Sequence, residues 1–224
     1  MQATRSGFMV RKIISIVLKS IVAAASIVGV VLSLVGSASD ALFFTIQSNI
    51  WIGITCIVAL VFMFAKVQIK QWMYTVKLMF TVSITLTGVV FCTMLAPLLG
   101  NQAYTFSSIL LHVLVPVASV ADFFVYDYTG EFKKWECLLV TVPPFYYLGF
   151  AGIGYVCKWN FGYGGQNYPY FFLNWGSPAG AFGFSSEFPF MGVFYYILIL
   201  LAFVVGIGVL YIFFASIIRR KMEK

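Results

Sequence analysis

The sequence predicts an all-α, polytopic membrane protein, in which a single domain of residues 1–224 forms a six-transmembrane-helix bundle with both termini cytoplasmic. The chain is 62% hydrophobic and only 9% charged, with a mean hydropathy of +0.97, whereas a soluble domain is about 25% charged. Six apolar runs are long enough to cross a bilayer core, which takes about 20 residues each. Basic residues fall between these runs, which argues against a nucleic-acid partner despite the net charge of +7.

The apolar runs define the helices in order. We expect them at residues 13–36, 41–65, 76–99, 104–126, 137–157 and 190–217. The first run follows basic residues and ends in small ones, as a secretory signal peptide does. Its apolar core is longer than that of a usual signal peptide, so we expect a retained helix. Ser39 or Asp40 is placed to cap the second helix.

The basic residues predict the orientation of the helices. All of the 14 Lys and Arg residues except Lys158 lie at one end of the predicted bundle, and cytoplasmic loops are enriched in such residues. Lys19 lies within the first helix, and we expect its long side chain to reach the inner headgroups. Pro116 and the pair Pro143-Pro144 lie within helices, where a missing backbone donor predicts kinks.

The segment of residues 158–189 is rich in Gly and aromatic residues and has neither helical nor strand periodicity. A loop of this length is usually functional or disordered, and its apolar character argues against disorder. We expect either an interfacial lid on the outer face or an aromatic belt at the headgroups, and the two interpretations are compatible. The four cysteines have no metal-ligand spacing, so we expect no metal site, no disulfide and no cofactor.

Polar residues inside the helices point to a bundle interior, since a polar side chain in lipid needs a partner. The fourth helix carries one polar stripe, formed by Thr105, Ser108, His112, Ser119 and Asp122. The second helix carries another, formed by Thr45, Ser48, Asn49, Thr55 and Cys56. The stripe of the third helix, formed by Thr81, Thr85, Gly88 and Cys92, is interpreted as a packing face.

Thr45 and His112 are the candidate catalytic residues. Both helices start at the outer surface, and a rise of about 1.5 Å per residue places the two side chains at similar depths. Imidazole can accept a hydroxyl proton near neutral pH, and a threonine hydroxyl needs such a base to attack an ester. Ser48, Asn49 and Ser108 are candidates for holding the oxyanion or substrate. A purely structural histidine is the alternative interpretation.

Asp122 is too distant to complete a catalytic triad. It lies ten residues beyond His112, which is about 15 Å along a helix. We expect it at the inner membrane surface, paired with Lys133 or Lys134 or facing headgroups.

Three motifs resemble the androgen-induced and androgen-dependent integral-membrane proteins, in particular bacterial members of that family. The motifs are Phe43-Phe44-Thr45-Ile46-Gln47-Ser48-Asn49, then Leu111-His112-Val113-Leu114-Val115-Pro116 followed by Asp122-Phe123, and finally Tyr168-Pro169-Tyr170-Phe171-Phe172-Leu173. The sequence departs from the bacterial pattern at Phe44 and Phe123, where Tyr and Trp are expected. The three motifs occur in the family's order within a six-span frame.

This resemblance implies an intramembrane threonine hydrolase in a bacterial plasma membrane. Animal members cleave fatty-acid esters of hydroxy fatty acids with a threonine and a histidine that match Thr45 and His112, and a distant branch consists of acyltransferases. We therefore expect a lipid or fatty-ester substrate. The alternatives are a small-molecule or lipid transporter or channel, with a polar pathway between the second and fourth helices, and a non-enzymatic membrane adaptor.

Overall fold

Six helical spans form the protein, as the sequence predicts. The computed structural model describes residues 2–162 and 165–222, with side chains from Gly7 onward. Six helices there are long and apolar enough to cross a membrane: Gly7–Gly36, Phe44–Phe64, Gln71–Tyr104, Phe106–Val125, Lys134–Val156 and Val193–Met222. Each span overlaps one predicted run. Of the described residues, only Phe184 and Met191 form an isolated β-bridge.

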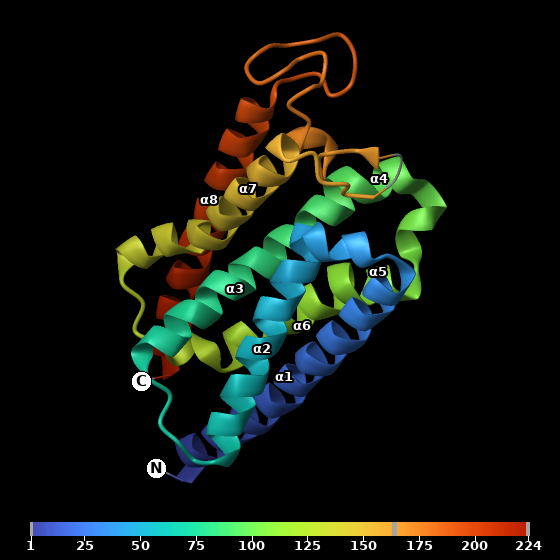
Figure 1. Cartoon of the computed structure of the whole chain (residues 1–224). Helices are drawn as coiled ribbons and strands as arrows, with labels where there is room; N and C mark the ends of the chain where they lie inside the picture. The colour runs from blue at the N-terminus through green and yellow to red at the C-terminus, as the bar shows by residue number, and fades with distance from the viewer. Residues whose placement is uncertain (1, 163–164, 223–224) are drawn as a thin grey trace.

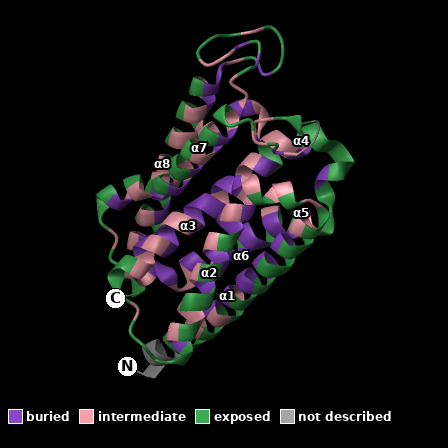
Figure 2. Cartoon of the chain, viewed as in Figure 1, coloured by how far each residue is buried: buried purple, intermediate pink, exposed green. Residues whose placement is uncertain are grey.

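The third span is central to the bundle. It begins with α3 (Gln71–Val90), which packs against α2 (Phe44–Phe64), α6 (Val115–Val125) and α8 (Val193–Met222). The first helix, α1 (Gln2–Gly36), packs along α2 and α6. On the other side of α3 from α1 lie α7 (Val142–Val156) and α8 (Figure 1). Buried residues gather on the faces that these helices turn toward α3 (Figure 2).

The two ends of the bundle differ in what they contain. The terminal end holds the first turn of α1 and the last turn of α8, and the loop end holds the long connection between α7 and α8 (Figure 1). Which end faces the cytoplasm stays a prediction from the basic residues. Thr45 and His112 lie in the half toward the loop end.

Two spans contain a π-helical turn directly before a proline. In the third span, the turn Phe91–Leu95 precedes α4 (Ala96–Leu99), which has Pro97 in its first turn. In the fourth, α5 (Phe106–Ile109) leads into the turn Leu110–Leu114, and Pro116 follows in the first turn of α6. Proline cannot donate to the carbonyl four residues earlier and its ring crowds that group, and a wider turn relieves both problems.

Pro143 and Pro144 do not kink a helix, contrary to the sequence prediction. The fifth span starts as a 3₁₀ segment, Lys134–Thr141, and α7 begins at Val142. Both prolines therefore lie in the first turn of α7, where backbone N–H groups have no intrahelical partner and proline costs nothing. The fifth span changes helix type at this point.

Lys19 and Asp122 are buried, which corrects both sequence predictions. Lys19 Nζ lies 2.9 Å from an Asp122 carboxylate oxygen and 3.0 Å from one of Asp127, and Lys77 Nζ lies 3.0 Å from Asp122. The side chains of Lys19 and Asp122 are both 0% exposed. Ser15 donates a further hydrogen bond to Asp122. Lys19 therefore does not reach headgroups, and Asp122 pairs with neither Lys133 nor Lys134.

These five side chains, Ser15, Lys19, Lys77, Asp122 and Asp127, are called the charge cluster below. Burying one ion costs several kcal/mol unless partners replace its water, and residues of α1, α3 and α6 supply the partners together. The cluster is the main polar contact between these helices toward the terminal end. Burial raises the pKa of Asp127, which lies just beyond α6, to about 6.

The long loop between α7 (Val142–Val156) and α8 has two parts. The first returns to the bundle, where Phe161, Phe172 and Leu173 are buried. The second, residues 177–192, projects beyond the ends of the helices (Figure 1) and exposes the rings of Phe182, Phe184 and Phe190. The first part of the loop thus covers the bundle and the second exposes aromatic rings, and the lid and the headgroup belt stay predictions. Tyr163, one of its aromatics, lies outside the described residues.

Candidate active site

Thr45 lies in the first turn of α2, and no side-chain cap fixes the start of this helix. The 3₁₀ segment Ala38–Leu42 and the extended residue Phe43 precede the helix, and no side chain caps it. Asp40 instead accepts a hydrogen bond from the Ser33 hydroxyl. The predicted capping by Asp40 or Ser39 is therefore wrong.

Ser48 and Asn49 both contact the backbone carbonyl of Thr45. The Asn49 amide donates to the Thr45 carbonyl oxygen at 2.8 Å, and the Ser48 hydroxyl lies 3.1 Å from the same oxygen. The Asn49 amide also contacts the Leu111 carbonyl oxygen at 3.2 Å, and Ser48 shares a hydrogen bond with Thr87. These contacts fix the start of α2 against the fourth span. They direct Ser48 and Asn49, two of the three candidates for holding the oxyanion or substrate, at protein groups and not at the Thr45 hydroxyl.

His112 lies in the middle of the π-helical turn Leu110–Leu114. An added Cβ at Gly88 would lie 3.0 Å from the His112 carbonyl oxygen and 3.1 Å from Pro116. Only a residue without a side chain lets α3 approach the turn this closely. The predicted packing face of the third helix thus positions the histidine backbone.

The two candidate catalytic side chains meet. Thr45 Oγ1 lies 3.2 Å from His112 Nε2. On the other side of the ring, Nδ1 lies 3.0 Å from the Ser108 carbonyl oxygen and 3.1 Å from its hydroxyl. A carbonyl oxygen only accepts, so in the neutral ring Nδ1 carries the hydrogen and Nε2 presents its lone pair to Thr45. This arrangement of nucleophile, base and orienting group is the one that activates a hydroxyl.

Phe91 orients the imidazole further. Its ring stacks on that of His112, with centroids 3.8 Å apart and planes 16° from parallel. Phe91 comes from the π-helical turn of the third span and His112 from that of the fourth. Sequence reasoning missed Phe91, because an aromatic residue in an apolar run carries no signal of which ring it will face.

Tyr170 is the second residue that sequence reasoning did not assign to the site. Its ring stacks on Phe172, meets Phe43 edge-on and contacts Tyr147. Burial is the largest influence on its hydroxyl and raises the pKa of Tyr170 to about 12, against the smaller lowering influence of the neighbouring Thr45. The phenol is therefore protonated at neutral pH and able to donate. Membership of the Tyr-Pro-Tyr motif was the available signal.

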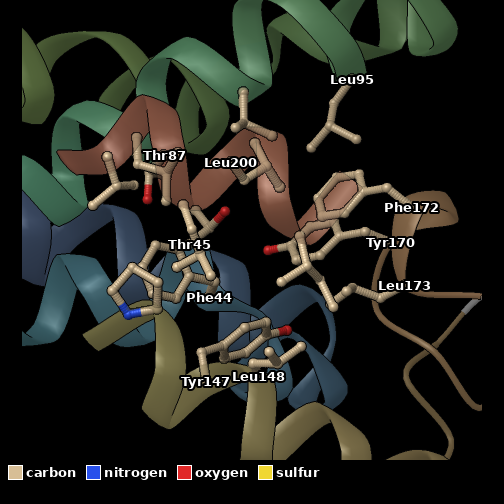
Figure 3. Close-up of a pocket in the computed structure, with 16 residues that line it drawn as sticks. Phe44, Thr45, Thr87, Leu95, Tyr147, Leu148, Tyr170, Phe172, Leu173 and Leu200 are labelled. Atoms are coloured by element: carbon tan, nitrogen blue, oxygen red, sulfur yellow. The ribbon is translucent and has the colours of Figure 1, made fainter. Parts of the chain in front are cut away.

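Two cavities border Thr45. A cavity of about 90 Å³ lies between α2, α3, α7 and α8, with Tyr170 and Leu173 on its loop side (Figure 3). A wider cleft of about 600 Å³ lies on the other side, lined by residues of α1, α2, the third and fourth spans and the loop. We call them the small cavity and the vestibule. Thr45 and Tyr170 line both, whereas His112 lines only the vestibule.

The contact between Thr45 and His112 lies apart from any cluster of metal-ligating side chains in the described part of the chain. Among the described residues, no three His, Cys, Asp or Glu side chains gather as a metal site would require.

Comparison of the chain with protein-family models, with curated proteins and with solved structures finds no match.

Proposed function

We propose that this protein is a membrane-embedded esterase that hydrolyses fatty-acid esters through Thr45. The contact of 3.2 Å between Thr45 Oγ1 and His112 Nε2 carries the proposal. The three sequence motifs that resemble the androgen-induced and androgen-dependent proteins support it independently, since they contain both residues. The apolar surroundings of Thr45 suit a lipid substrate.

In the first step, His112 Nε2 takes the hydroxyl proton while Thr45 Oγ1 attacks the ester carbonyl carbon. The carbonyl oxygen becomes an oxyanion, and the phenol of Tyr170 is placed to donate to it. Such a donor in a dry site contributes roughly 3–4 kcal/mol to the transition state. Ser48 and Asn49, which bond to backbone carbonyls and to Thr87, support the nucleophile instead.

In the second step, the ester C–O bond breaks and His112 passes its proton to the departing alcohol. The acyl group stays on Thr45 as an ester. A water molecule entering through the vestibule then attacks the acyl carbon with His112 again as base, which releases the fatty acid and restores the hydroxyl. The methyl group on the threonine Cβ crowds the attack, so turnover is expected to be slow.

The test compares Thr45→Ala, Thr45→Ser and His112→Ala in purified protein against a panel of fatty esters. Thr45→Ala and His112→Ala should each abolish hydrolysis, whereas Thr45→Ser keeps the nucleophile and should remain active. A fluorophosphonate probe should label the wild type and Thr45→Ser and leave Thr45→Ala unlabelled. Wild-type rates in Thr45→Ala or His112→Ala would refute the proposal.

A transporter is the second candidate, and the charge cluster favours it. Ionisable side chains buried within membrane spans often mark ion or proton pathways, and Lys19, Lys77 and Asp122 lie within spans. Vesicles containing the purified protein separate the two functions. Solute flux that persists in Thr45→Ala, without probe labelling of the wild type, would favour transport.

A further inference from the structure

The position of His112 assigns the two cavities to the two halves of the substrate; this step rests on the proposed esterase function. The base that takes the Thr45 proton must return it to the departing alcohol oxygen. His112 lines the vestibule and not the small cavity. The alcohol half must therefore lie in the vestibule, and the acyl chain must extend the other way.

The small cavity suits the part of an acyl chain next to the ester, since its volume of about 90 Å³ holds a few methylene groups. Its walls include Phe44, Leu86, Leu148 and Leu200. Its few polar atoms are bonded to the protein, since the Thr87 hydroxyl pairs with Ser48 and the Tyr147 hydroxyl donates to the Leu42 carbonyl oxygen. Apolar surface is what a hydrocarbon chain gains from binding.

The vestibule is more polar than the small cavity and carries little charge. Its lining includes hydroxyl and amide groups from Ser37, Gln102, Thr105, Ser107 and Gln166. Among its described lining residues, Asp40 is the one Asp or Glu, and no Lys or Arg is present. Asp40 accepts a hydrogen bond from Ser33. A negatively charged alcohol half would meet a carboxylate here and find no cation.

We propose that the substrate is a fatty ester of a neutral, hydroxyl-bearing alcohol, such as a monoacylglycerol. Thr45 Oγ1 bonds to the acyl carbon, the C–O bond to the glycerol oxygen breaks, and that oxygen receives the proton held by His112. The remaining hydroxyls of the alcohol exchange hydrogen bonds with the uncharged polar groups of the vestibule. An ester of a hydroxy fatty acid, whose alcohol half ends in a carboxylate, is the disfavoured substrate because its charge would repel that of Asp40.

The experiment measures kcat/KM of the full-length protein in detergent for two esters with the same acyl chain. One is a 1-monoacylglycerol and the other an ester of a hydroxy fatty acid, assayed at a pH where the acid is ionised. The neutral ester should be preferred by at least roughly tenfold, the factor that corresponds to about 1.4 kcal/mol. Equal rates, or a preference for the anionic ester, would overturn the proposal.

Three variants test whether Asp40 causes the preference. Asp40→Asn removes the charge and should bring the ratio of the two rates closer to one. Ser33→Ala removes the hydrogen bond from the Ser33 hydroxyl to Asp40 but keeps the Asp40 charge, so it should preserve the ratio of the two rates. Glu187→Gln, the matched control, removes an acidic charge from an exposed loop residue outside the cavity lining and should also preserve it.

The outcomes also separate this inference from the esterase function. If neither ester is cleaved and no probe labels Thr45, the esterase proposal has failed. If Thr45-dependent hydrolysis occurs with the anionic ester preferred, only the assignment of the alcohol half has failed. An unchanged ratio in Asp40→Asn would remove Asp40 as its cause and overturn the charge argument.

Discussion

Two polar clusters of the bundle differ in charge, in burial and in access to open space. Toward the loop end, Thr45, His112 and Ser108 form a neutral chain of hydrogen bonds that borders the vestibule. Toward the terminal end, the charge cluster joins two lysines to two aspartates. A mostly apolar groove of about 250 Å³ between α2 and α3 borders Lys77 and Asp127, but their charges are already paired.

This difference indicates that the terminal half and the loop half of the bundle have different roles. Ions that neutralise one another in a low-dielectric interior hold helices in one arrangement, because separating them leaves an unpaired buried charge. A neutral pair at 3.2 Å that borders empty space can admit a third participant. We infer that the terminal half fixes the positions of α1, α3 and α6, and that chemistry takes place in the loop half.

Breaking the charge cluster should give the largest effect. Lys19→Met leaves Asp122 and Asp127 with Lys77 as their remaining lysine partner, and removing one member of a buried ion pair costs about 3–5 kcal/mol. Thermal unfolding in detergent should show a correspondingly large drop in Tm. Lys12→Met, on the same helix but only half-buried, is the control and should change Tm little. Similar Tm values for the two variants would contradict a locking role.

The pH dependence of stability is a second test of the charge cluster. The pKa of Asp127 is raised by burial to about 6 from its ordinary value of 3.8, so between these values the folded state holds a proton that the unfolded state has released. The contribution of Asp127 to the free energy of unfolding is fully present below about pH 4, and it is lost as the pH rises through about 6. The loss is at most about 3 kcal/mol, at 1.36 kcal/mol per pKa unit.

The measurement is the difference in unfolding free energy between wild type and Asp127→Asn from pH 4 to 7. Lys19, Lys77 and Asp122 surround the group and remain in both proteins. The wild type should lose stability relative to the variant as pH rises through this range. A flat or opposite difference would contradict the raised pKa.

In the loop half, Tyr170→Phe should slow catalysis without unfolding the protein. Loss of one oxyanion donor costs about 10²-fold or more when the donor is ideally placed, and we expect a fall in kcat of roughly 10–100-fold. KM should change little, since the ring remains. Tyr195→Phe, which alters a ring stacked on Phe184 away from the site, is the matched control. An unchanged kcat would exclude Tyr170 as the donor.

Ser108→Ala should have the smallest effect. His112 loses the hydroxyl contact at 3.1 Å but keeps the backbone carbonyl at 3.0 Å, so its orientation survives. A net hydrogen bond contributes about 1 kcal/mol, and we expect at most about a fivefold loss of kcat/KM. Ser119→Ala removes a buried hydroxyl that has no hydrogen-bond partner and should leave kcat/KM unchanged. A loss as large as that of His112→Ala would mean that the Ser108 hydroxyl orients the ring.

Sequence reasoning reached the Thr45–His112 pair because each residue is the reactive member of a polar stripe that helical spacing predicts. It failed where a residue's role depends on a neighbour from another span. Lys19 was predicted to leave the bundle, since no sequence pattern shows that two aspartates of the fourth span region face it. Phe91 and Tyr170 were missed for the same reason.

Composition and the spacing of apolar runs alone determined that this chain forms six membrane-length helices, because each helix satisfies its own backbone and needs only apolar residues to lie in lipid. Which polar side chains meet was decided only by the tertiary structure. The π-helical turns before Pro97 and Pro116 rotate Phe91 and His112 into contact, and the loop returns Tyr170 to Thr45. These contacts depend on helix rotation and crossing, which arise from packing between spans and not from the periodicity of any one of them.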